Sequence, residues 1–135
     1  MYLSYNQYFN VNCNETRGIN VFPKIIEILF SNKNSININK SLYNELFYIV
    51  RIIAKRHIFF KQFITNYLQY VNNNKVYNFL LILTENIDQL NILYRMFYKA
   101  KLLGNGILYG KIMQRINIII ELDKKLHDEF LKFCS

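Results

Sequence analysis

The sequence predicts an all-α protein, an up-down-up-down four-helix bundle preceded by an irregular N-terminal arm. Apolar residues recur at three- and four-residue steps through four segments, which is the period of a helix that buries one face. The chain of 135 residues also contains only one Pro and four Gly, so few positions interrupt a helix. A chain of this length forms one domain with a substantial core.

The predicted elements follow one another with short connections. Residues 1–20 are polar and aromatic without a period and are expected to form the arm, and residues 21–135 the bundle. Asn20 is the expected cap of the first helix, and Gly104 is the expected stop of the third. Short connections place consecutive helices antiparallel. The helices are expected over residues 21–30, from 39 or 41 to about 71, over 75–103 and from about 107 to 133.

The third of these helices is the most regular. Its residues Phe79, Leu83, Leu90 and Phe97 fall within about 40° of one another at 100° per residue. Asn86 lies inside this apolar stripe. A polar residue there either sets the register of a helical interface or bonds to a neighbouring helix. On the opposite side of the helix lie Asp88, Arg95 and Lys99.

No membrane span and no secretion signal are expected. The longest wholly apolar run is Phe79–Leu83, far below the roughly 18–20 residues of a spanning helix. The N-terminus lacks a basic stretch followed by an apolar one. Cys13 and Cys134 have no partner motif, which favours two free thiols in a reducing compartment. A cytoplasmic protein without membrane association is therefore predicted.

The net charge of +8 is concentrated in the middle of the chain. Residues 46–120 contain ten Lys or Arg and two acidic residues, whereas the flanks together hold seven of each sign. Charge of one sign on a folded region favours a polyanionic partner.

Three pairs of basic residues are spaced four apart, so each pair shares one face of a helix: Arg51 and Lys55, Arg95 and Lys99, Lys111 and Arg115. With Lys61 they form the predicted nucleic-acid-binding set, suited to phosphate contacts without sequence preference. The alternative is a solvated cationic surface. Helix tyrosines could stack on unpaired bases, although packing in the core or between subunits is favoured.

No catalytic residue, metal ligand or cofactor site is predicted, because no metal-ligand cluster, phosphate-binding Gly loop or nucleophile–base pattern occurs. One alternative is the R-x(4–6)-H pattern of HEPN ribonucleases, matched by Arg51 and His57. His57 would act as acid or base and Arg51 would stabilise a phosphorane. However, the two lie about 120° apart on one helix, and His57 falls within its apolar stripe, so a buried histidine is favoured.

Residues 87–109 resemble one family of small helical bundles. Ile87, Leu90 and Arg95 match the spacing of an L-x-x-L-x-x-x-x-R stretch, followed by Lys99, a Gly/Asn turn and Tyr109. This pattern is similar to the accessory variability (Avd) proteins of diversity-generating retroelements and the related 23S rRNA intervening-sequence proteins. The family's Phe-Pro before the second helix and its C-terminal Gly-Gly-Trp signature are missing here.

The resemblance implies a non-catalytic basic bundle that oligomerises as a ring, typically a pentamer. Such a protein would bind template RNA or its cDNA and partner the reverse transcriptase of the element. Arg95 corresponds to the arginine of the family's third helix. A helical module that binds a partner helix in an apolar groove remains a third interpretation, beside the HEPN-like ribonuclease.

Overall fold

The computed structural model describes residues 20–33, 40–67, 74–104 and 106–134, and it confirms an all-α four-helix bundle. The helices are α2 (Val21–Ser31), α3 (Lys40–Tyr67), α4 (Asn74–Leu103) and α5 (Tyr109–Cys134). Within these ranges the backbone forms no strand, and the Ile118-Ile119-Ile120 run is helical as expected. The predicted arm, apart from Asn20, lies outside the described residues.

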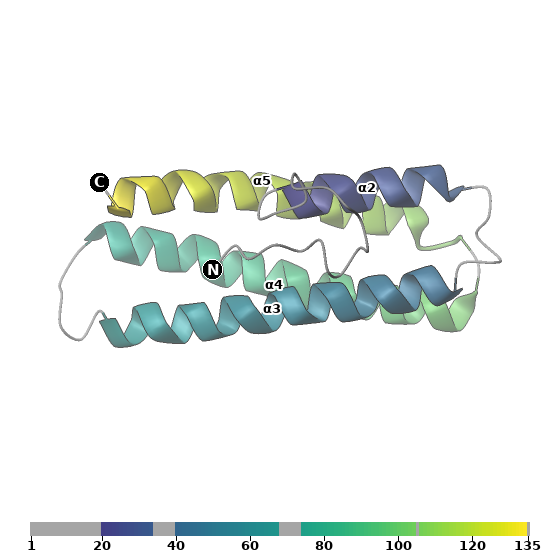
Figure 1. Ribbon diagram of the computed structural model, residues 1–135, viewed down its shortest axis with the longest axis horizontal. Helices are drawn as coiled ribbons and strands as arrows, with labels where there is room; N and C mark the ends of the chain where they lie inside the picture. Colours follow the sequence, from purple (N-terminus) through teal and green to yellow (C-terminus); the bar gives the residue numbers. More distant parts are fainter. Residues whose placement is uncertain (1–19, 34–39, 68–73, 105, 135) are drawn as a thin grey trace, which may run out of the picture.

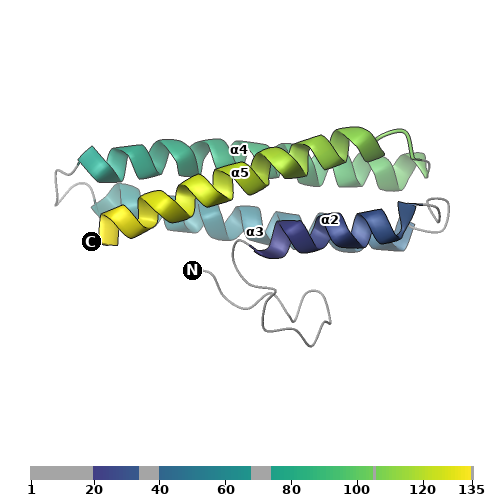
Figure 2. The same ribbon diagram turned by 90° about the horizontal axis from the view of Figure 1, so that it is seen from above.

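Consecutive helices run antiparallel, so the chain goes up, down, up and down (Figure 1). α3, α4 and α5 have 28, 30 and 26 residues, whereas α2 has only 11. Both views place α2 beside the end of the bundle where α3 begins and α4 ends (Figure 2). One end of the bundle therefore contains four helices, and the other contains three.

The hydrophobic core is divided in the same way. The larger cluster, at the four-helix end, buries Phe22 and Ile25 of α2 against Leu46 of α3, Phe97 of α4 and Ile116 of α5. The smaller cluster, at the three-helix end, consists of Ile64, Val76, Phe79, Leu83, Ile87 and Leu126. Each cluster removes large apolar side chains from water, which is the main favourable contribution to folding.

Three buried polar side chains, His57, Asn86 and Asp123, separate the two clusters along the helices. They come from α3, α4 and α5 respectively. The sequence predicts His57 inside the apolar stripe of the second helix and Asn86 inside that of the third, and the burial of both side chains confirms this.

The turn between α4 and α5 begins at a glycine in the left-handed region. Gly104 has φ of 65°, and its N–H donates a 3.0 Å hydrogen bond to the carbonyl of Ala100. This arrangement satisfies one carbonyl at the helix end, and glycine adopts the conformation without a steric penalty. The expected stop is thus confirmed. Asn20 occupies the N-cap position of α2 as expected, but its side chain makes no capping hydrogen bond, so that part of the prediction is wrong.

The helical period predicts that Tyr67 lies in the buried stripe of α3, but its side chain is 38% exposed. Tyr67 follows the buried Ile49 by 18 residues, which is five whole turns, so both lie on the same side of α3. Ile49 belongs to the larger cluster, at the four-helix end, whereas Tyr67 is the last residue of α3, at the end of the bundle that α2 does not reach. The helical period therefore gives the side of α3 on which Tyr67 lies, but among the described helices α2 ends too early to cover that side at this end of the bundle.

Candidate nucleic-acid interface

The seam between α3 and α4 carries a cluster of four aromatic rings, which we call the aromatic cluster: Phe47, Tyr48, Tyr94 and Tyr98. Phe47 lies at its centre, with ring centroids 5.1 Å from Tyr48, 5.6 Å from Tyr94 and 5.7 Å from Tyr98. Phe47 and Tyr94 are half-buried against the larger core cluster, whereas Tyr48 and Tyr98 are exposed. The helix pair thus presents two rings to solvent on a packed base.

One cation contacts the aromatic cluster, and three more are exposed on the same two helices. The guanidinium of Arg51 lies 6.0 Å from the centroid of the Phe47 ring, a cation–π contact. Lys55 is exposed one turn further along the same face of α3. Arg95 and Lys99 directly follow Tyr94 and Tyr98 in the chain, so each lies about 100° around α4 from its tyrosine, on the outer side that also carries Asp88, and both are exposed. We call Arg51, Lys55, Arg95 and Lys99 the seam cations.

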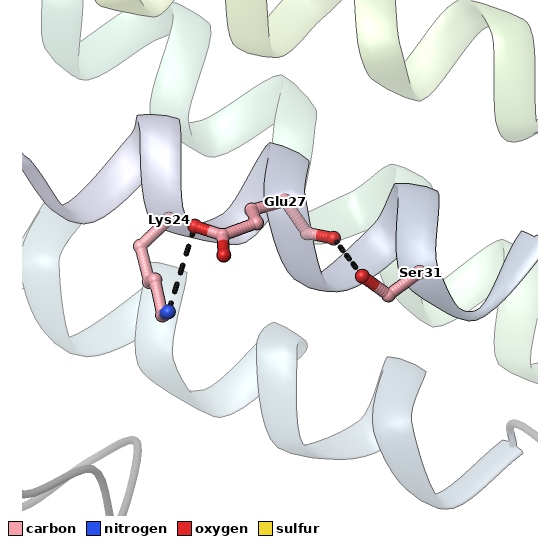
Figure 3. A network of polar contacts seen from close by, with 3 residues as sticks. All are labelled: Lys24, Glu27 and Ser31. Atoms are coloured by element: carbon pink, nitrogen blue, oxygen red, sulfur yellow. Dashed lines mark hydrogen bonds and ion pairs between the residues drawn. The ribbon is translucent and has the colours of Figure 1, made fainter.

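The ion pairs in the described part of the chain involve other residues. They join Lys24 to Glu27, Lys124 to Glu121 and Lys132 to Glu129, all three residues apart on one helix. Figure 3 shows the example on α2, where Nζ of Lys24 lies 3.5 Å from Oε2 of Glu27 and the Ser31 hydroxyl donates to the Glu27 carbonyl. The positive charge of the seam cations is therefore not neutralised by such local pairs.

The basic pair on α5 lies on a different flank of α4. Arg115 is half-buried and donates a 2.6 Å hydrogen bond from Nη1 to Oε1 of Gln89. Gln89 precedes Tyr94 by five residues, which is about 140° around α4. Lys111, one turn before Arg115, is exposed. The seven predicted cations therefore do not form one continuous surface, and Arg115 is used in holding α4 to α5.

Lys61 lies away from the seam cations. It is half-buried and lines a surface groove of about 450 Å³ together with Ile58, Gln62, Thr65, Asn66 and Ile87. Lys61 follows Arg51 by ten residues, about 15 Å along the helix. One cation over a mixed polar and apolar groove is weak support for a phosphate site.

Arg51 and His57 of the ribonuclease pattern do not meet. Arg51 is exposed at the aromatic cluster, whereas His57 is only 3% exposed in the core. The Nδ1 of His57 lies 2.9 Å from the carbonyl oxygen of Ile53 and donates to it, which leaves Nε2 buried without a hydrogen-bond partner. Burial lowers the pKa of His57, and the bond to Ile53 opposes this effect only in part. A scissile phosphate has no access to this ring.

The other buried titratable group is a carboxyl. Oδ1 of Asp123 accepts a 2.7 Å hydrogen bond from Nδ2 of Asn86. Burial raises the pKa of Asp123 to about 7, and the hydrogen bond from Asn86 lowers it by less. Among the described residues, no three His, Cys, Asp or Glu side chains are grouped so that they could hold a metal ion.

The helix tyrosines are not all buried by packing, as the sequence pattern favours for them. Tyr48 and Tyr98 pack on Phe47 with one part of the ring and expose the rest. A signal was present in the sequence: an aromatic pair at residues 47–48 is followed by the cations 51 and 55, and Tyr94 and Tyr98 directly precede Arg95 and Lys99. The sequence predicts that the two helices pair, but not which of their faces meet.

None of the helices in the described ranges is both long and apolar enough to serve as a transmembrane span. No family profile matches the chain, and neither the curated proteins nor the solved structures contain a significant match. The likeness to the accessory variability proteins over residues 87–109 therefore stays a prediction.

Proposed function

We propose that this protein is a nucleic-acid-binding helical bundle, without a catalytic site of its own, that holds RNA or its cDNA on the α3–α4 seam. The observation that carries the proposal is the set of four exposed seam cations on the two helices that form the aromatic cluster, with Arg51 in contact with Phe47. Around Arg51 and Lys55, the sequence from Leu46 to Thr84 contains no acidic residue, whereas Asp88 shares the outer side of α4 with Arg95 and Lys99. A surface with an excess of cations over carboxylates attracts the phosphates of a nucleic acid.

The biological setting of the proposal comes from the resemblance alone. In that setting the partner protein is the reverse transcriptase of a diversity-generating retroelement, and the bundle is a homo-oligomer, typically a pentamer. Several copies of one seam on a ring would raise the affinity for a long strand through effective concentration. Light scattering after size exclusion tests the ring, and co-purification with the reverse transcriptase tests the partner.

The binding surface is tested by reversing charge at Arg95 and Lys99 together, to Glu. RNA retention at about 150 mM salt is expected to be lost, with helicity and oligomer size unchanged. The matched control is Lys124→Glu with Lys125→Glu, which changes the net charge equally at two exposed positions of α5. The control is expected to retain RNA. Retention by the Arg95/Lys99 variant would contradict the assignment of this surface.

The salt dependence gives a second measure of the same contacts. Each phosphate contact with a single strand contributes a slope of about −0.7 in log affinity against log salt, so four seam cations predict a slope near −3. Incubation of the purified protein with RNA is expected to leave the RNA intact. Cleavage that is lost in His57→Ala would overturn the proposal in favour of a ribonuclease.

A further inference from the structure

The aromatic cluster is held in place before any ligand binds. Phe47 makes edge-on contacts with Tyr48 and Tyr94, with interplanar angles of 73° in both, and a tilted contact with Tyr98. Phe47 and Tyr94 are in turn packed against the larger core cluster. Rings that are already fixed lose little conformational freedom when another ring stacks on them.

The two outer rings remain open to solvent. Tyr48 is 52% exposed and Tyr98 is 47% exposed, one from each helix of the seam. Both contact Phe47, so they flank a common centre. Exposure alone does not distinguish these two rings, since Phe30, Phe59 and Phe63 are more exposed. Tyr48 and Tyr98 differ in that they pack on one ring, Phe47, which also contacts the guanidinium of Arg51.

Positive charge lies on both helices that carry these rings. Arg51 lies over Phe47, and Arg95 and Lys99 follow the α4 tyrosines. Lys101 donates a 2.7 Å hydrogen bond to the Asn44 side chain, which joins the two helices one turn from the cluster through a neutral partner. This hydrogen bond holds the ammonium group of Lys101 at the α3–α4 seam without neutralising its charge.

Aromatic rings with adjacent cations are suited to unpaired bases, because a base stacks on the ring while its phosphate contacts the cation. In a duplex, each base is already stacked between its neighbours, so the faces of the bases are not available to these rings. We infer that the aromatic cluster binds unpaired bases through Tyr48 and Tyr98, so that the ligand of the seam is single-stranded nucleic acid. This inference rests on the proposed function and specifies its substrate class.

The test compares one strand of about 16 nucleotides with the same strand in a duplex, at equal salt. The wild-type protein is expected to bind the single strand at least tenfold more tightly. Tyr48→Leu combined with Tyr98→Leu is expected to weaken single-strand binding at least tenfold and to leave duplex binding within twofold. Replacement of both by Phe keeps the rings and is expected to restore single-strand binding.

Tyr77→Leu is the matched control. Tyr77 is 50% exposed and also lies on α4, but it lines a separate groove with Leu81, Glu85 and Asp88. The loss of its ring is expected to change neither affinity. A fall in single-strand binding equal to that of the Tyr48/Tyr98 variant would show that the effect does not depend on the aromatic cluster.

A measurement on the unmodified protein guards against a variant that fails to fold. Photocrosslinking of a 5-iodouridine strand, followed by peptide mapping, is expected to attach the base to Tyr48 or Tyr98. Crosslinks confined to other segments would overturn the inference. If charge reversal at Arg95 and Lys99 abolishes binding while the Leu variants bind like the wild type, the inference is wrong and the proposed function stands. If no nucleic acid is bound at all, both are wrong.

Discussion

Asn86 of α4 and Asp123 of α5 form a buried pair, with a 2.7 Å hydrogen bond from Nδ2 of Asn86 to Oδ1 of Asp123. Asn86 is fully buried and Asp123 is 4% exposed. The pair lies between the two core clusters, together with His57 of α3. A hydrogen bond at this depth restricts how α4 and α5 slide past each other, since a shift would leave both groups unpaired.

Asp123 is expected to make the protein less stable as pH rises. Its pKa is about 7 in the folded protein and 3.8 as an isolated side chain, so between these values the folded state binds more protons than the unfolded state. The contribution is fully present below pH 4 and is lost as pH rises through 7, an effect of about 4 kcal/mol. Urea unfolding at several pH values measures this.

The control for Asp123 is the Asn variant, which keeps an oxygen to accept from Asn86 but does not ionise. Asp123→Asn is expected to be more stable than the wild type at pH 8 and close to it at pH 4. The difference in free energy of unfolding between the two proteins cancels the titration of groups that they share. An equal difference at both pH values would show that Asp123 does not titrate in this range.

His57 is expected to have the opposite effect. Its pKa is below 6.5 in the folded protein, so the unfolded chain takes up the proton first as pH falls, and stability is lost below pH 6.5. His57→Leu removes that loss and also removes the buried Nε2, which has no hydrogen-bond partner. The variant is expected to gain more stability over the wild type at pH 5 than at pH 7.5. A gain that is independent of pH would contradict a buried neutral histidine.

The helices could be predicted from the sequence because each one buries a single stripe. Phe79, Leu83 and Leu90 recur at the helical period, and the structure buries all three. The short first helix could also be predicted, since turn-forming residues follow Phe30. The exposure of Tyr67 could not be predicted, because it depends on which helix covers that side of α3 and how far this helix extends.

The binding surface could be predicted only in part. A spacing of four residues shows that Arg51 and Lys55 share a face of one helix. It does not show how that face is turned relative to the next helix, so the sequence could not separate the seam cations from Arg115. The aromatic cluster depends on the same unknown, since its rings come from two helices that pair across about 50 residues of chain.

Two glycines near the α4–α5 turn are expected to respond in opposite ways to alanine. Gly104 has φ of 65°, where a side chain is strained, so Gly104→Ala is expected to cost about 1 kcal/mol. The new Cβ would also lie 2.9 Å from Cε of Lys40, the mobile end of a long side chain that can move away.

Gly110 lies in α5 and has open space around it, so Gly110→Ala is expected to stabilise the protein by up to about 1 kcal/mol. Thermal unfolding of the two single variants checks both signs. If both variants lose stability, the space around Gly110 is not open. If both gain stability, Gly104 is not in the left-handed conformation.

Arg115 is expected to act in stability and not in nucleic-acid binding. Its hydrogen bond to Gln89 joins α5 to α4, and its side chain is half-buried. Arg115→Met keeps the long apolar stem but removes the charged donor, and is expected to cost about 1–2 kcal/mol of unfolding free energy. RNA affinity and its salt slope are expected to stay within error of the wild type.

Arg51→Met, at the aromatic cluster, is expected to show the reverse, with little change in stability, weaker binding and a slope reduced by about 0.7. If Arg115→Met weakens RNA binding as much as Arg51→Met does, the nucleic acid also contacts the α4–α5 flank, and the surface is broader than the α3–α4 seam.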